Sequence, residues 1–247
     1  MNSSENNQNH FHSTLLNHLL ELRRVILFCA ASVGVAFAVI FFVLIDYIMS
    51  WITKPIQQKG LQIIYTTMSE VFLTKFKVSV IAAIISASPV IIWQIWGFIK
   101  PALYPHEQKN FRYLFFIALI LFLSGVIFCY YCVYWLAVDF FIIQGSGLAV
   151  PMLSIDKYVG FLFSFVIPFG CAFQLPVAVY ILAKLNLTSY KSLASKRKYI
   201  LLAIFIIAAI LTPPDVISQI ALGIPLYALF ELGVQVSRFA APKKSQD

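Results

Sequence analysis

Long stretches of hydrophobic residues, uninterrupted by charge, dominate the chain. From Tyr113 to Val138 there is no Asp, Glu, Lys, Arg or His. A helix that is apolar on every face is typical of a membrane span, which needs about 20 apolar residues. Similar stretches predict six spans, over residues 25–44, 71–99, 113–138, 158–183, 199–212 and 216–236. We therefore predict a single all-α polytopic membrane domain with six transmembrane helices.

The fifth stretch is shorter than the others. Its 13 apolar residues, 199–211, would rise roughly 20 Å as a helix, against a hydrocarbon core about 30 Å thick. Either the bilayer thins there or the last two segments form a re-entrant hairpin. The tip between them contains Pro213 and Pro214, which cannot continue a helix, and Asp215, which can cap the next one.

Two amphipathic stretches flank the first span. Residues 14–24 place several leucines on one side at helical spacing, which predicts a short helix at the membrane surface. Residues 47–58 mix apolar and polar positions and could lie at the opposite surface. The predicted organisation is a tail with an interfacial helix over 1–24, the bundle over 25–236 and a second tail over 237–247.

Basic residues orient the predicted spans. With the N-terminus inside, 13 of the 18 Lys and Arg residues fall on the cytoplasmic side and 5 on the other. The positive-inside rule therefore places both termini in the cytoplasm. A net charge of +8 could also indicate a nucleic-acid partner. We exclude that partner because the basic residues lie between apolar segments.

Prolines and amides interrupt the apolar segments. Pro89, Pro168, Pro176 and Pro225 lie inside predicted spans, where proline bends a helix, so we expect kinked helices that frame a concave face. An amide in lipid is costly unless it is hydrogen-bonded, so Gln174 should face protein, water or a partner helix. The same question applies to Gln219.

Few carboxylates are available for recognition, since Asp and Glu total 10. Glu21 and Glu107 both fall on the predicted cytoplasmic side. Each has a structural interpretation, Glu21 as a partner of Arg24 or His18 and Glu107 as a first-turn acid after a proline. Together they could instead bind guanidinium groups, which offer a carboxylate two parallel hydrogen bonds. Glu231 precedes Arg238 by about 10 Å of helix and could pair with an arginine.

The sequence contains no familiar catalytic or cofactor motif. It lacks the phosphate-binding Gly-x-x-x-x-Gly-Lys-Ser/Thr loop, and no His, Cys and carboxylate group has metal spacing. We expect no cofactor, no metal and no enzymatic activity. Most predicted spans also lack the deep ionisable group that ion-coupled transporters keep near the midplane. A small-molecule permease and a membrane-embedded enzyme remain as alternatives.

Several motifs, in order, carry a resemblance to a known family. They are His18-Leu-Leu-Glu21-Leu-Arg23, Ser69-Glu70-Val-Phe72, Ser88-Pro89-Val90, Pro101-Ala-Leu103-Tyr104-Pro-His-Glu107, Phe173-Gln174-Leu-Pro176, Leu211-Thr212-Pro213-Pro214-Asp215 and Phe230-Glu231. Over about residues 18–238 the chain resembles TatC, the polytopic core of the twin-arginine (Sec-independent) protein translocase.

The resemblance implies a receptor in the bacterial cytoplasmic membrane that binds the paired arginines of signal peptides on folded cargo. It implies TatA- and TatB-type single-span partners, a homo-oligomeric complex and transport driven by the proton gradient. The signal-peptide residues it implies are Glu21, Glu107, Arg23 and His18. The polar residues of the concave face are Gln174, Gln219, Glu231 and Asp215, and the structural prolines are Pro89, Pro101, Pro176, Pro213 and Pro214.

Two positions depart from the family pattern. Gln174 stands where many relatives carry Glu, and a glutamine can hydrogen-bond but cannot exchange a proton. Val25 stands where a further basic residue is common, so one contact with phosphate or cargo is missing.

Overall fold

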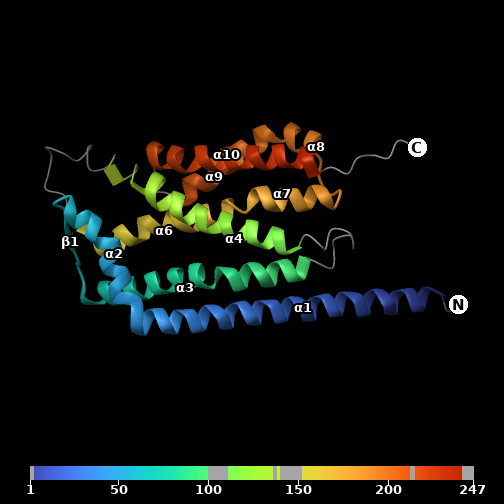
Figure 1. The fold of residues 1–247 in the computed structure, drawn as a ribbon, viewed down its shortest axis with the longest axis horizontal. Coiled ribbons are helices and arrows are strands. Elements are labelled where there is room, and N and C mark those ends of the chain that lie inside the picture. The colour runs from blue at the N-terminus through green and yellow to red at the C-terminus, as the bar shows by residue number, and fades with distance from the viewer. Residues whose placement is uncertain (1–2, 100–110, 136–137, 140–151, 212–214, 241–247) are drawn as a thin grey trace.

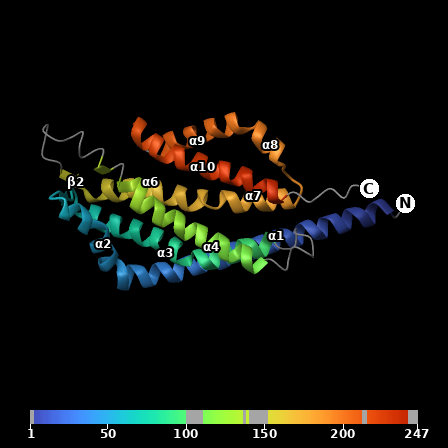
Figure 2. The same ribbon diagram turned by 45° about the horizontal axis from the view of Figure 1, so that its top comes forward.

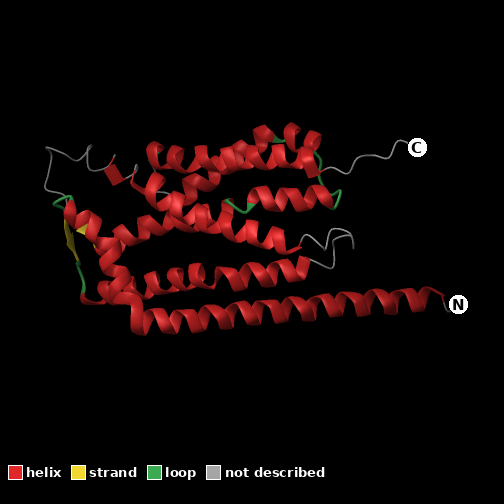
Figure 3. Ribbon diagram, in the orientation of Figure 1, coloured by secondary structure: helices red, strands yellow, loops and turns green. Residues whose placement is uncertain are grey.

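The fold is almost entirely helical. It is a computed structural model of the chain and describes residues 3–99, 111–135, 138–139, 152–211 and 215–240. The described regular elements are helices apart from two strands of three residues each (Figure 3). The prediction that this domain is built from helices is therefore confirmed for the described residues.

The N-terminal part is one long helix followed by a sharp change of direction. Helix α1 (Ser3–Val39) passes into a π-helical turn, η1 (Ile40–Leu44), and then into α2 (Ile45–Gln58). Figure 1 shows α2 running away from the line of α1. Since α1 is continuous, residues 14–24 extend the first apolar helix, and the prediction of a separate short helix is wrong. Nothing in this stretch breaks a helix, because it contains neither Gly nor Pro.

The remaining elements return through the bundle several times. They are β1 (Gln62–Ile64), α3 (Met68–Ile99), α4 (Phe111–Phe128), the π-helical η4 (Cys129–Tyr134), β2 (Met152–Ser154), α6 (Ile155–Ala172), α7 (Leu175–Lys184), α8 (Tyr190–Ser195), α9 (Arg197–Leu211) and α10 (Val216–Ala240). Figures 1 and 2 show α1 packed along α3, then α4 with α6 and α7, then α9 and α10 on the far side.

Five helical stretches in the described part of the chain are long and apolar enough to cross a membrane. They are Leu20–Gln58, Met68–Phe98, Arg112–Tyr134, Ile155–Lys184 and Val216–Arg238. These correspond to five of the six predicted spans. The remaining predicted span, the fifth in sequence order, corresponds to α9. This helix has 15 residues and is short, as its sequence indicated.

Helices α4 and α6 approach closely through a reciprocal pair of glycines. A Cβ on Gly125 would lie 2.8 Å from Cγ of Phe173, and one on Gly170 would lie 2.9 Å from Cε2 of Phe122. Each glycine therefore accepts a phenyl ring from the other side of the contact. Small residues at helix interfaces allow this approach, which compensates for the absence of a hydrophobic driving force in lipid.

The bundle has two distinct ends. Helix α1 begins and α10 ends at one of them, which we call the terminal end (Figure 1). At the opposite end, the loop end, β1 pairs in parallel with β2. The register places Gln62 opposite Met152 and Ile64 opposite Ser154. This short ladder joins the segment before α3 to the segment before α6.

A single carboxylate, Glu70, organises the loop end. Its Oε2 accepts hydrogen bonds from the Thr66 amide at 2.6 Å, the Thr66 hydroxyl at 2.7 Å and the Thr67 amide at 3.4 Å. Its Oε1 accepts from the Ser154 hydroxyl and from the Asp156 amide at 3.3 Å. One oxygen therefore caps α3 and the other caps α6, and the side chain is 8% exposed.

Ion pairs surround this centre. Lys75 Nζ lies 2.5 Å from Oδ1 of Asp46, and Lys77 Nζ lies 2.5 Å from Oδ1 of Asp156. Lys59 pairs with Asp139. These pairs are largely exposed, so each contributes little alone, but together they join α2, α3 and α6 at the loop end.

We expect Glu70→Gln to lower the melting temperature in detergent by several degrees. A glutamine keeps one acceptor oxygen, so it can cap either α3 or α6 but not both, and its NH2 group faces donors. The measurement is thermal unfolding of the purified protein, with hydrogen exchange at the Asp156 amide. The control is Lys75→Gln, which removes an exposed ion pair and should leave the melting temperature nearly unchanged. Equal stability of Glu70→Gln and the unsubstituted chain would contradict this role.

Candidate functional site

Three of the four predicted signal-peptide residues, His18, Glu21 and Arg23, lie on α1. Glu21 and Arg23 are exposed on the helix surface, and the Arg24 guanidinium lies 5.6 Å from the centre of the Phe28 ring. His18 lies on the same helix, in the stretch before Leu20 where side chains are not described. Glu107 lies outside the described residues. The pairing of Glu21 with Glu107 therefore stays a prediction.

Gln174 occupies the break between α6 and α7. Its backbone amide donates to the Cys171 carbonyl at 3.0 Å, and α7 begins at the next residue with Pro176 in its first turn. Its side-chain Nε2 donates to the Ala118 carbonyl of α4 at 3.0 Å. Of the three environments expected for this amide, protein, water or a partner helix, its Nε2 finds protein. The bond gives this amide a partner inside the protein, which lowers the cost of burying a polar side chain among the helices.

The hairpin formed by α9 and α10 is held by two polar side chains. Oδ1 of Asp215 accepts from the Ser218 amide at 2.6 Å, which confirms the predicted cap of α10. Nε2 of Gln219 donates to the Phe205 carbonyl of α9 at 3.0 Å. The glycine at 223 brings the same two helices together, because a Cβ there would lie 3.1 Å from the Phe205 ring.

Glu231 forms a two-point ion pair, but with a different arginine from the one considered in the sequence. Arg197 Nε donates to Oε2 of Glu231 at 3.0 Å, and Nη2 donates to Oε1. Arg238 instead places its guanidinium 4.8 Å from the centre of the Tyr190 ring. The Arg197 pair joins the start of α9 to α10 in the geometry that a planar guanidinium and a carboxylate favour.

The structural prolines behave differently from one another. Helix α3 continues through Pro89 and α10 continues through Pro225 without leaving the helical conformation. The chain does leave it just before Pro176, where α6 ends and α7 starts. Pro101, Pro213 and Pro214 lie outside the described residues.

Sequence reasoning did not single out Glu70 as a site, although a local signal was present. Thr67 and Glu70 are separated by two residues, which is the spacing of a capping box, and α3 begins directly after Thr67. The Glu70 contacts to Ser154 and Asp156 bridge more than 80 positions of sequence, so no local pattern could reveal them.

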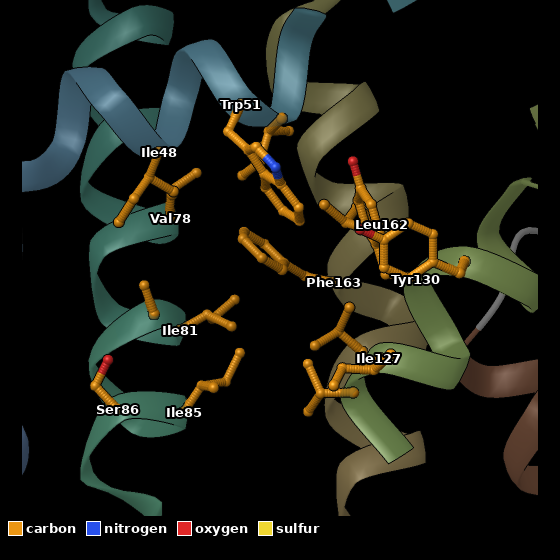
Figure 4. Close-up of a pocket in the computed structure, with 15 residues that line it drawn as sticks. Ile48, Trp51, Val78, Ile81, Ile85, Ser86, Ile127, Tyr130, Leu162 and Phe163 are labelled. Atoms are coloured by element: carbon orange, nitrogen blue, oxygen red, sulfur yellow. The ribbon is translucent and has the colours of Figure 1, made fainter. Parts of the chain in front are cut away.

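An apolar cavity of about 310 Å³ lies below α2, between α3, α4, η4 and α6 (Figure 4). Ile48 and Trp51 of α2 enter it from above, Ile81 and Ile85 of α3 from one side and Phe163 of α6 from the other. Its polar atoms are few, and Ser86 supplies a hydroxyl. This cavity was not expected from the sequence, because its walls come from four separate segments.

The described residues offer groups for binding rather than for metal chemistry. Among them, no set of three His, Cys, Asp or Glu side chains lies close enough together to hold a metal ion. The four cysteines are free thiols, so the closely spaced Cys129 and Cys132 form no disulfide. Many polar side chains in and beside the spans form helix caps, ion pairs or bonds to backbone carbonyls. The buried hydroxyls of Ser88, Tyr134 and Ser218 have no hydrogen-bond partner in the part of the chain that the structure describes.

Comparisons with known proteins agree over nearly the full chain. The family profile described as Sec-independent protein translocase protein (TatC) matches residues 17–225. The chain is 40% identical over 232 residues to the Sec-independent protein translocase protein TatC of Carboxydothermus hydrogenoformans, covering 94% of this chain and 95% of that protein. It is 36% identical to the protein of the same name from Escherichia coli K12, covering 93% and 90%.

A solved structure shows the same fold. The crystal structure of the twin arginine translocase receptor TatC matches with a TM-score of 0.82 at 34% identity, covering 90% of this chain and 99% of that one. The match includes the helical bundle that positions the residues described above. The chain is therefore a multi-pass membrane protein of the TatC family, a component of the Sec-independent protein translocase.

Proposed function

We propose that this protein is the signal-peptide receptor of its translocase and that it binds paired arginines at the terminal end. The observation that carries the proposal is that Glu21 and Arg23 are exposed on α1, on either side of Leu22, which lines a groove with Ile95 from the last part of α3. The solved relative is itself named a twin arginine translocase receptor. Family membership also favours a translocase over the permease and the membrane-embedded enzyme, because the relatives are named translocase proteins.

The proposed orientation places the terminal end in the cytoplasm. Four lysines lie near that end, around α8, together with the ion pair of Arg197 and Glu231. They are Lys184, Lys191, Lys196 and Lys198. This distribution supports the positive-inside arrangement. We propose that α9 also crosses the membrane, which brings the number of spans to six, and that the bilayer thins around its 15 residues.

Recognition of arginine over lysine follows from the geometry of the two ions. A guanidinium presents a planar fork that donates two parallel hydrogen bonds to one carboxylate, whereas an ammonium acts as a point charge. Each charged hydrogen bond contributes about 1.5–3 kcal/mol before screening, and less at an exposed surface. We propose that Glu107 and Glu21 each take one arginine, with Arg23 and His18 beside them. A pair of such contacts gives discrimination that one carboxylate could not supply.

We expect Glu107→Ala to abolish the preference for a twin-arginine signal peptide over its twin-lysine counterpart. The purified protein in nanodiscs should bind the Arg-Arg peptide more tightly, and the variant should bind both peptides with similar weak affinity. The measurement is fluorescence anisotropy of labelled peptides. Asp46→Ala serves as the matched control, because Asp46 is a carboxylate at the loop end and its loss should leave the preference intact. A preference retained in Glu107→Ala would remove this residue from the site.

Partner helices of the TatA and TatB type are proposed to dock along α7, α9 and α10. The Nε2 atoms of Gln174 and Gln219 are both bonded to backbone carbonyls of this chain. Each amide can still accept a hydrogen bond at its Oε1, to which no residue in the described part of the chain donates. A polar side chain on a partner helix could donate there. Transport by this complex is proposed to draw on the proton gradient, and the receptor to assemble with further copies of itself.

We expect a cysteine at position 174 to form a disulfide with a partner helix. In a background without the four native cysteines, Gln174→Cys and Ala178→Cys should be trapped with single-cysteine TatA- or TatB-type proteins, since both positions lie at the start of α7. Val35→Cys on α1 is the control, because it is 68% exposed on a different part of the bundle. The measurement is non-reducing electrophoresis of membranes after oxidation. Cross-links at neighbouring positions but never at 174 would count against the amide contact.

A further inference from the structure

The cavity below α2 lies in the half of the bundle nearer the loop end. Val78 and Ile81 line it from the first part of α3, and Leu162 lines it from the first part of α6, and both helices begin at the loop end. Helix α2 covers it on that side, held in place by the Tyr158 hydroxyl, which donates to the Ile52 carbonyl at 2.8 Å. The cavity is therefore at the depth of the acyl chains of one leaflet.

The lining selects an apolar occupant. It consists of aliphatic and aromatic side chains, with Ser86 and the tyrosines at 130 and 131 as the polar exceptions. Water needs several polar partners to remain in a cavity, and these walls do not provide them. A hydrocarbon chain needs no polar partner, because it can pack against these walls through dispersion contacts alone.

The cavity has room for a hydrocarbon chain. About 310 Å³ is open between α2, α3, α4, η4 and α6.

Helix α2 carries a lysine, Lys54, one turn from a residue of the cavity wall. Trp51 is half exposed at the edge of the cavity, where its ring stacks on Tyr130 with centroids 4.7 Å apart. Lys54 follows three residues later, one turn along the same helix, on its exposed side. Three other lysines of the loop end pair with aspartates, but Lys54 has no ion-pair partner among the described residues.

We propose that this cavity binds one acyl chain of an anionic glycerophospholipid from the leaflet at the loop end, with Lys54 holding its phosphate. Tryptophan and tyrosine favour the interface between headgroups and hydrocarbon, so Trp51 and Tyr130 mark the depth at which the headgroup would sit. The chain then fills the space beneath α2, and the phosphate neutralises a cation that no carboxylate of the described residues reaches. The bound lipid becomes part of the packing of α2 on the bundle.

The experiment uses Trp51 as the reporter. Its three companion tryptophans, Trp93, Trp96 and Trp135, are replaced by phenylalanine, and the full chain is reconstituted in vesicles of unlabelled phosphatidylcholine. A small fraction of either phosphatidylglycerol or phosphatidylcholine with brominated chains is added, because bromine quenches a nearby indole. We expect phosphatidylglycerol to quench Trp51 at a roughly fivefold lower fraction, the ratio that one lysine near an anionic lipid contributes.

Two variants, Lys54→Gln and Ala82→Phe, locate the site, and Lys157→Gln is the control. Lys54→Gln should abolish the preference for phosphatidylglycerol, while Lys157→Gln, which alters another exposed lysine of the loop end, should keep it. Ala82→Phe, which fills the cavity, should reduce quenching by both lipids. Lys54→Gln changes an exposed side chain, so it tests the headgroup contact even where Ala82→Phe does not fold.

Three results would overturn the proposal. Equal quenching of the unsubstituted chain by both lipids would exclude a bound anionic headgroup. A preference that survives Lys54→Gln would exclude this lysine as its ligand. A photoreactive benzoylphenylalanine at position 81 that cross-links to a protein, and not to lipid, would show that a partner's side chain occupies the cavity.

Discussion

The hydrocarbon core sets the central constraint on this fold, because it offers no water to satisfy a backbone polar group. Continuous helices meet this constraint by themselves, and most of the chain is built from them. The informative places are those where helical bonding stops. At the break before α7 a side-chain amide from Gln174 bonds the Ala118 carbonyl, and at the start of α10 Asp215 bonds the Ser218 amide. The Asp215 cap satisfies a backbone amide that the start of α10 leaves free, whereas the Gln174 bond satisfies the polar side chain itself.

The two ends of the bundle are stabilised differently. At the loop end, Glu70 bonds the first residues of two helices at once, and ion pairs join α2, α3 and α6 around it. At the terminal end the described polar contacts lie on α8, α9 and α10, with the Arg197 pair as the main one. The loop end therefore forms a cap across several segments, and Glu21, Arg23 and Arg24 are exposed on α1. That arrangement suits a surface that receives a charged peptide.

Local patterns in the sequence predicted the features that depend on neighbouring residues alone. The apolar stretches located the spans, the proline pair before Asp215 located a helix cap, and the count of 13 residues identified α9 as short. Contacts between distant segments were not accessible in this way. An arginine partner was expected for Glu231, but the sequence did not identify it as Arg197, 34 positions away. The continuity of α1 was missed because an amphipathic pattern does not show where a helix without Gly or Pro begins or ends.

The residue at position 174 separates two roles that a carboxylate could combine. An ionisable side chain there could both bond a neighbouring helix and exchange a proton, whereas Gln174 can only bond, and its Nε2 is already committed to α4. The structural role of the position is therefore preserved without its charge. A mechanism that draws on the proton gradient in this chain must take its proton-carrying group from elsewhere, either from another residue of this protein or from a partner. The amide at 174 contributes to the packing of the start of α7 on α4 through its bond to Ala118.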